Sequence, residues 1–193
     1  MALIYSGEKL SWAGFGEWLA TSGMEGYQSA DNQHIVDTGP IPEGQYTLPL
    51  KIGGNAKITS YKTDKAGRLT EGNLDVRSEI QSLACIKNPV DKKDDPNDDT
   101  VIFPNWGSNR VRLTRVKLFG KNTAHRGGFY IHDSTKGYTH GCIEVGPGFF
   151  DVLREYAKNH GKRQPTLSLL VLYTDDTTRG KTKTGKPVVK QCS

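Results

Sequence analysis

Apolar and polar residues alternate in short runs along most of the chain, which is the pattern of half-buried β-strands. Residues 3–5 and 10–12 are the first such runs, and the Ser6-Gly7 pair between them predicts a hairpin. Residues 110–118 alternate over a longer stretch. Their register breaks near Arg115, where a β-bulge would keep the apolar side chains on one face.

Other short runs of alternating or β-branched residues also predict strands, at residues 33–36, 45–48, 56–61, 101–103, 128–133 and 167–173. Residues 78–83 fit a helix or a strand equally well. One segment instead has apolar residues at helical spacing, namely Phe149, Val152, Leu153, Tyr156 and Ala157. Pro147 before it and Gly161 after it are typical helix boundaries. The pattern predicts a mainly β protein with one main helix near residues 147–160.

The composition fits a single globular domain. The chain has 193 residues, of which 22 are Gly and 9 are Pro, so many turns are expected. We predict one domain over residues 1–175, with a charged loop at 87–100 inserted in it, and a basic flexible tail at 176–193.

The formal net charge of +5 favours an anionic partner such as nucleic acid, anionic lipid or an acidic wall polymer, although it also serves solubility. No apolar run approaches the roughly 20 residues that span a membrane, so no membrane insertion is expected. The first residues lack a basic region followed by an apolar stretch, so we expect no secretory signal peptide.

Three cysteines leave at least one thiol free. Cys142 is the predicted free thiol, whereas Cys85 lies in an apolar run and is interpreted as a small buried residue. Pairing of Cys85 with Cys192 is possible, but the sequence does not favour it.

The clearest chemical pattern joins a predicted strand that ends at His132 to a tight turn that delivers Cys142 onto the next strand. If the two meet, the imidazole can take the thiol proton and leave a nucleophilic thiolate. His140 is interpreted as a support for the turn rather than the base. In papain-like enzymes the cysteine precedes the histidine by many residues, so the order here argues against that class.

Two alternatives stay open, a metal site and a purely structural role. A metal site would use ligands from His125, His132, His140 and Cys142, but no two of them have the short spacing of a helical metal motif. We therefore predict no metal and no cofactor.

Several neighbours have predicted roles in a thiol mechanism. Asp133 or a backbone carbonyl would orient the imidazole, and the backbone N–H groups of Gly141 and Cys142 would stabilise an oxyanion. Candidate substrate-binding residues are Tyr130, Tyr138 and Thr139.

Residues 139–143, Thr-His-Gly-Cys-Ile, resemble the Ser/Thr-His-Gly-Cys-hydrophobic signature of the L,D-transpeptidase (YkuD-type) catalytic domain. His132 matches the upstream base of that family, and residues 39–46 are similar to its Thr-Pro-x-Gly-x-Tyr/Phe turn. The gap of ten positions between His132 and Cys142 is shorter than usual, and resembles the type VI secretion L,D-transpeptidase effectors. The resemblance covers roughly residues 1–50 and 125–175.

The chain departs from the general family at Glu144, where an arginine often follows the signature and contacts a substrate carboxylate. One of Arg110, Arg112 and Arg115 is predicted to replace that arginine, because a guanidinium can bind a carboxylate in bidentate fashion.

The resemblance implies a β-sandwich or barrel with a helix after the cysteine turn. It also implies a thioester enzyme acting on peptidoglycan tetrapeptide stems, as an L,D-carboxypeptidase, in D-amino-acid exchange or in cross-linking. A type VI effector would have a cognate immunity protein and a secretion-apparatus partner, would not bind nucleic acid, and would act in the periplasm of the target bacterium. The alternatives are a zinc-dependent peptidoglycan hydrolase and a non-catalytic wall-binding module.

Overall fold

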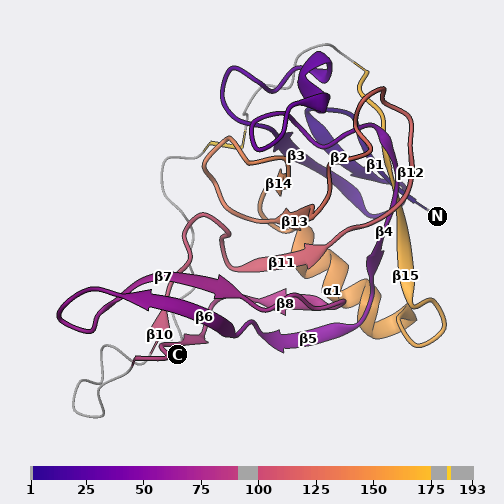
Figure 1. Ribbon diagram of the computed structural model, residues 1–193. Coiled ribbons are helices and arrows are strands. Elements are labelled where there is room, and N and C mark those ends of the chain that lie inside the picture. The colour runs from indigo at the N-terminus through magenta and orange to yellow at the C-terminus, as the bar shows by residue number, and fades with distance from the viewer. Residues whose placement is uncertain (1, 91–99, 175–181, 184–193) are drawn as a thin grey trace.

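One large sheet organises the structure, a computed structural model that describes residues 2–90, 100–174 and 182–183 (Figure 1). The strands are β1 (Ala2–Tyr5), β2 (Lys9–Trp12), β3 (Gly16–Ser22), β4 (Gly44–Pro49), β5 (Ile52–Asn55), β6 (Ile58–Thr63), β7 (Leu69–Leu74), β8 (Ile80–Ser82), β9 (Ile86–Lys87), β10 (Thr100–Val101), β11 (Asn109–Arg112), β12 (Thr114–Leu118), β13 (Tyr130–His132), β14 (Ile143–Val145) and β15 (Thr166–Val171). The helices are the 3₁₀-helix η1 (Ala30–His34) and α1 (Phe149–His160). This bears out the prediction of a mainly β protein with one main helix.

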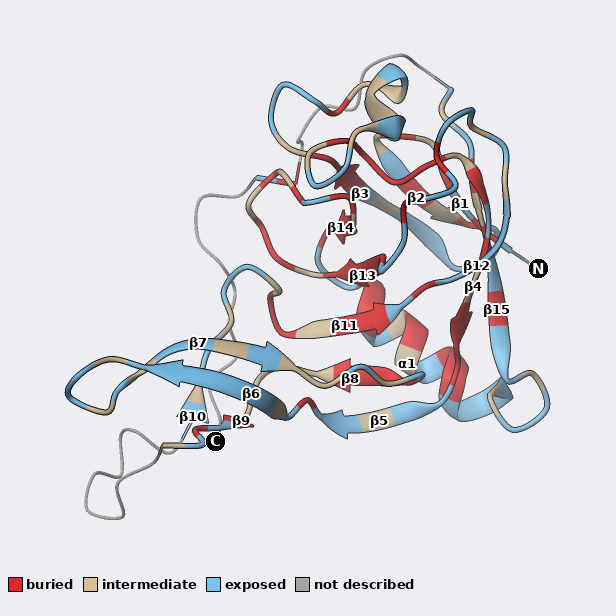
Figure 2. Ribbon diagram, in the orientation of Figure 1, coloured by how far each residue is buried: buried red, intermediate tan, exposed pale blue. Residues whose placement is uncertain are grey.

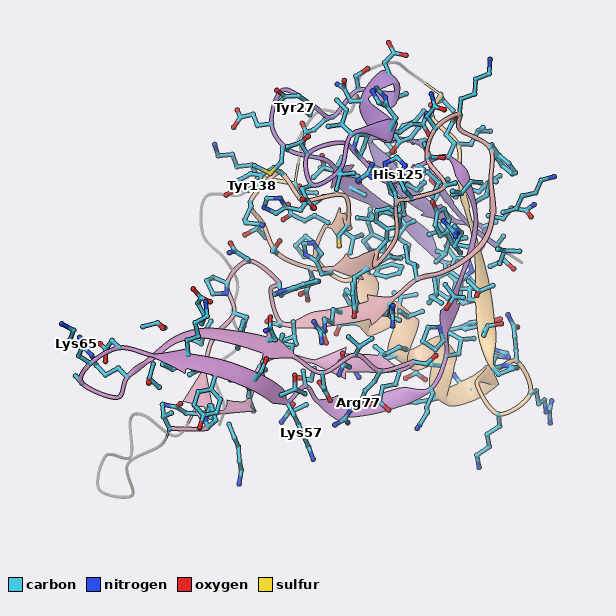
Figure 3. The ribbon with its side chains drawn as sticks, viewed as in Figure 1. Tyr27, Lys57, Lys65, Arg77, His125 and Tyr138 are labelled. Carbon is cyan, nitrogen blue, oxygen red and sulfur yellow. The ribbon has the colours of Figure 1, made fainter. Side chains whose placement is uncertain are left out.

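Eleven strands pair in the order β12-β4-β15-β1-β2-β3-β14-β13-β11-β8-β5. The parallel pair of β1 and β15 brings distant parts of the chain together, and β13 lies parallel to β14, which follows it after ten residues. The β6–β7 hairpin forms a separate two-stranded sheet that projects from the body, with Lys65 at its far end (Figures 1 and 3).

The main core lies between the sheet and α1. Val111, Ile131 and Ile143 face it from three adjacent strands and are fully buried. The helix contributes the buried face that its spacing predicts, including Phe149 and Leu153, and Figure 2 shows this face behind β13 and β11. Since β-strands alternate, the opposite face of β11, β13 and β14 carries the polar residues that build the site described below.

Several predicted elements are confirmed. The hairpin at residues 3–12 is β1–β2, and Pro49 is the last residue of β4. The helix begins at Phe149 with Gly148 as its left-handed N-cap, so Pro147 lies before the first turn rather than in it. Residues 78–83, which fitted either type of element, contain strand β8.

Two predicted strands are wrong in part. Residues 33–36 overlap η1 instead, where the Ser29 side chain accepts a hydrogen bond from the Asp31 N–H and caps a helical turn. Residues 110–118 form two strands, because β11 pairs with β13 and β8 whereas β12 pairs with β4. Alternation is the same on both sides of this change of partner, so the sequence does not show it. The predicted irregularity near Arg115 is confirmed as a register shift between Arg115 and Lys117. It does not keep the apolar side chains on one face, because Val116 is exposed.

Cys85 differs from its interpretation as a buried free thiol, because it is partly exposed and disulfide-bonded. Most of the charged loop at 87–100 and of the tail at 176–193 lies outside the described residues. Among the described helices, none has the length and apolar character needed to cross a membrane.

Core packing of α1 leads to a stability prediction. Leu153→Ala should lower the free energy of unfolding by about 2–5 kcal/mol, because it leaves a cavity under a fully buried side chain. Lys158→Ala, on the exposed face of the same helix, should change it by no more than about 0.5 kcal/mol. Urea titrations of the two variants check this, and equal destabilisation would contradict the packing of α1.

Candidate active site

The parallel pairing of β13 and β14 brings His132 and Cys142 to one cavity. Ile131 pairs with Ile143 and His132 with Glu144, so Cys142, just before β14, lies beside Tyr130. A hydrogen bond from the backbone of Tyr130 reaches the Cys142 thiol and stabilises its thiolate form. Cys142 and His132 both line a cavity of about 280 Å³. The strand end and the strand start thus bring the two residues to one cavity, and their roles as base and nucleophile stay a prediction.

The turn before Cys142 depends on Thr139 and Gly141. The Thr139 Oγ1 accepts hydrogen bonds from Gly23 N at 3.0 Å and Gly141 N at 3.2 Å, and donates one to Cys142 O at 2.6 Å. This hydroxyl is therefore committed to the backbone, although Thr139 was predicted to bind substrate. The Gly141 N–H is likewise engaged, which leaves the Cys142 N–H as the remaining predicted oxyanion donor.

Gly141 is required by conformation and by space. Its φ is +102°, in the region that favours glycine, and a Cβ there would lie 2.6 Å from Nη2 of the buried Arg126. The Arg126 guanidinium donates to Gln33 O, Gly39 O and Pro40 O, so it ties the segment before β4 to the cysteine turn.

A hydrogen-bonded chain fixes the imidazole of His132. Its Nδ1 lies 3.1 Å from Ser134 Oγ, and the Ser134 hydroxyl donates to the Glu144 carboxylate. A hydroxyl has one proton and a carboxylate can only accept, so the His132 Nδ1 must be the donor to Ser134. The Nε2 of His132 therefore carries the free lone pair, as a general base requires.

Glu144 anchors this chain although it is fully buried. Besides Ser134, its carboxylate accepts from the backbone N–H groups of Lys136 at 3.1 Å and Gly137 at 2.7 Å. The Thr182 hydroxyl donates to its Oε1 at 2.5 Å. These bonds compensate the cost of burying the charge and fix the loop between His132 and Cys142.

Asp133 does not orient the imidazole. Its carboxylate accepts from Ser108 N at 2.7 Å, Asn109 N at 2.8 Å and Asn109 Nδ2 at 2.8 Å. The prediction for Asp133 is corrected, because successive residues of a strand face opposite sides and Asp133 faces away from the side of His132.

The resting pair is electrically neutral. Burial raises the pKa of Cys142 to about 11, although the Tyr130 backbone bond and the nearby Lys136, Arg110 and Arg126 oppose this. Burial, with Lys136 and Arg110, lowers the pKa of His132 to about 3. At neutral pH the site therefore holds a thiol and a neutral imidazole, and the imidazole can accept the thiol proton during attack.

Aromatic and polar side chains form the rest of the cavity. Trp106 packs edge-on against His132 with ring centroids 5.4 Å apart, and against Tyr130 at 5.2 Å. The lining is completed by Asn105, Lys136, Tyr138, Thr139 and His140, so Thr139 lies at the cavity although its hydroxyl is committed to the backbone. The His140 Nδ1 lies 2.8 Å from Asp37 O, a contact that supports the turn, as predicted. Tyr130 does not line the cavity, since its ring stacks with Arg110.

The predicted arginines lie elsewhere. Arg112 and Arg115 are exposed and line a different cavity together with His125. Arg115 donates to Ala124 O and Arg126 O. Figure 3 shows His125 and Tyr138 well apart. Within residues 2–90, 100–174 and 182–183, no group of three or more His, Cys, Asp or Glu side chains is arranged to hold a metal ion.

Sequence reasoning missed Ser134, Lys136 and Trp106, and recorded Glu144 only as a departure from the family pattern. Ser134 and Lys136 lie between His132 and Cys142 in the chain, and this proximity is the signal that would have found them. No sequence pattern near Trp106 points to the site, because Trp106 is far from Cys142 in the chain. Its loop is held at the site by hydrogen bonds from Ser108 N and Asn109 N to Asp133. Comparison with known proteins finds no matching family model and no matching curated protein.

The imidazole orientation gives a spectroscopic prediction. In wild-type protein with ¹⁵N-labelled histidine, NMR at neutral pH should show His132 protonated on Nδ1. Ser134→Ala removes the acceptor of that proton, so we expect the Nε2-protonated form to gain population. Ser134→Thr keeps a hydroxyl and should keep the wild-type tautomer. A wild-type spectrum with the proton on Nε2 would contradict the hydrogen-bond directions.

Proposed function

We propose that the protein is a cysteine enzyme that cleaves or transfers peptidoglycan tetrapeptide stems through a thioester on Cys142. The observation that carries the proposal is that Cys142 lines one cavity with an imidazole whose Nε2 lone pair is free. The resemblance of residues 139–143 to the L,D-transpeptidase signature supports the choice of substrate.

The chemistry follows from the neutral pair. As Sγ of Cys142 attacks a stem peptide carbonyl, Nε2 of His132 takes the thiol proton, so no free thiolate has to persist in the buried site. Collapse of the tetrahedral intermediate breaks the C–N bond, and the leaving amine takes the proton from His132. A thioester remains on Cys142 and the C-terminal D-alanine is released.

The acceptor that resolves the thioester decides the reaction type. Water gives a carboxylic acid and regenerates the thiol, which is L,D-carboxypeptidase activity. A D-amino acid gives exchange, and the amine of a second stem gives a cross-link. In each case His132 takes a proton from the acceptor and returns it to the Cys142 sulfur.

The alternative of a zinc-dependent hydrolase has less support from the geometry. Its ligands would come from His125, His132, His140 and Cys142, but His125 lies at a different cavity. Among the described residues, no group of three or more His, Cys, Asp or Glu side chains is arranged to hold a metal ion.

We further propose delivery as a type VI secretion effector, with a cognate immunity protein in the producing cell and a secretion-apparatus partner. The short gap between His132 and Cys142 supports this, through its resemblance to that effector group. The target compartment would be the periplasm of a rival bacterium.

The catalytic proposal predicts that Cys142→Ala abolishes release of D-alanine from purified muropeptide tetrapeptides. His132→Ala should lower kcat about 10²–10⁴-fold, because general-base catalysis is lost. Intact-mass spectra of wild-type protein with substrate should show a transient acyl adduct that Cys142→Ala lacks. His125→Ala is the matched control and should keep activity. If wild-type protein leaves tetrapeptides intact and binds wall fragments as well as Cys142→Ala does, a wall-binding module replaces the enzyme.

The delivery proposal predicts that toxicity depends on compartment. Expression with an added periplasmic signal sequence should lyse or arrest a test bacterium, since the substrate lies outside the inner membrane. The same protein without the signal, and Cys142→Ala with it, should be harmless. Equal harmlessness of wild-type protein in both compartments would count against the effector role.

A further inference from the structure

Burial raises the pKa of Cys142, and the positive charges of Lys136, Arg110 and Arg126 act to lower it. The two arginines already use their N–H groups in hydrogen bonds within the protein. Arg126 donates to Gln33 O at 2.7 Å, Pro40 O at 2.5 Å and Gly39 O at 3.0 Å. These bonds, together with its burial, leave Arg126 a structural part of the cysteine turn.

Arg110 is committed in the same way. Its guanidinium donates to Gln81 Oε1 at 2.9 Å and to Asp75 O at 2.6 Å. It also stacks on the rings of Trp106 and Tyr130, with its Cζ 5.0 Å and 4.9 Å from their centroids. Arg110 is buried and does not line the cavity of Cys142.

Lys136 differs from both arginines. It is half-buried and lines the cavity beside Cys142 and His132. Its Nζ lies 4.6 Å from the Tyr138 ring centroid, and within the described part of the chain no carboxylate forms an ion pair with it. The Glu144 carboxylate acts on Lys136 only at longer range, where its charge raises the pKa of Lys136 against the larger effect of burial. Its oxygens accept from Ser134, Thr182 and backbone N–H groups, and it forms no ion pair with the Lys136 ammonium.

A partly desolvated ammonium with free N–H donors favours an anionic ligand, since burial lowers the pKa of Lys136 and an opposite charge would offset that cost. The Asn105 side chain adds a neutral polar group to the same lining. The cavity volume of about 280 Å³ is at the lower end of small-molecule sites, which suits one terminal residue better than a continuing chain.

We propose that Lys136 binds the C-terminal carboxylate of the residue that leaves when Cys142 attacks, so that the site is selective for acyl donors ending in a free carboxylate. This rests on the proposed function of Cys142. The carboxylate contact that the sequence analysis predicted for Arg110, Arg112 or Arg115 is thereby assigned to a lysine of the loop between His132 and Cys142. Trp106 and Tyr138 would enclose the same terminal residue.

The experiment compares two acyl donors that differ only at the end, a tetrapeptide stem with a free C-terminal carboxylate and the same stem with a carboxamide. Wild-type protein should prefer the free acid by about ten- to a hundredfold in kcat/KM, the usual range for a hydrogen bond to a charged group. Lys136→Met should reduce this preference to about one, and Lys136→Arg should retain most of it. Lys158→Met, an exposed lysine on α1, is the control and should leave the preference unchanged.

Lys136 also lowers the pKa values of Cys142 and His132, so its replacement could change the rate with any donor. The ratio of kcat/KM for the free acid to that for the carboxamide isolates binding of the carboxylate, because an effect on the reacting pair cancels in it. If Lys136→Met slows both donors equally and the preference survives, Lys136 acts only on the reacting pair and the proposal is overturned.

Binding to Cys142→Ala tests the same site without chemistry. Calorimetric titration should show tighter binding of the free acid than of the carboxamide, and Cys142→Ala/Lys136→Met should lose the difference. This result would support the carboxylate site even if the wild-type protein proved unable to cleave the stem. Equal binding of the two peptides to Cys142→Ala would overturn the carboxylate site, whether or not cleavage occurs.

Discussion

The fully buried carboxylate of Glu144 is the constraint on which the candidate site depends. It sits on β14 opposite His132 and accepts hydrogen bonds from both ends of the 134–137 loop. An unpaired charge at this position would be very costly, so the loop, Ser134 and Thr182 must hold their places for the sheet to form as it does. The orientation of the His132 imidazole thus follows from the need to satisfy one buried charge.

Burial also decides how the thiol can react. Burial penalises a charge, and hydrogen bonds offset this penalty at Glu144. At Cys142 and His132 the same penalty is not fully offset, so burial keeps both side chains in their neutral forms. Three cations oppose this at Cys142 without overcoming it. In the mechanism proposed above, the thiol would react only when a substrate carbonyl lies within reach of Sγ and the imidazole takes the proton in the same step. A thiol that stays protonated would also be less prone to adventitious alkylation or oxidation, because the thiolate is the reactive form.

The sequence predicted the parts of the fold and site that have local causes. Alternation gave the β1–β2 hairpin, helical spacing gave the buried face of α1, and the residue order gave a strand end at His132 next to a strand start at Cys142. It did not predict the split between β11 and β12, because a change of pairing partner leaves no mark on alternation. The role of Asp133 was assigned from adjacency in the chain, whereas the pleat turns Asp133 away from the face of His132.

Glu144 and Lys136 together explain why the arginine expectation failed. A carboxylate on β14 serves the imidazole and the loop, so that strand position no longer carries a cation toward the substrate. The arginines that alternation placed on one polar face divide between a buried stack, Arg110, and an exposed surface, Arg112 and Arg115. The cavity lining includes the Lys136 ammonium, which contacts the Tyr138 ring and forms no ion pair within the described residues. It comes from the loop that Glu144 holds through the Lys136 backbone N–H. The same buried carboxylate therefore orients the His132 imidazole through Ser134 and holds Lys136 through its backbone N–H, so the two groups to which we assign proton transfer and carboxylate binding share one anchor.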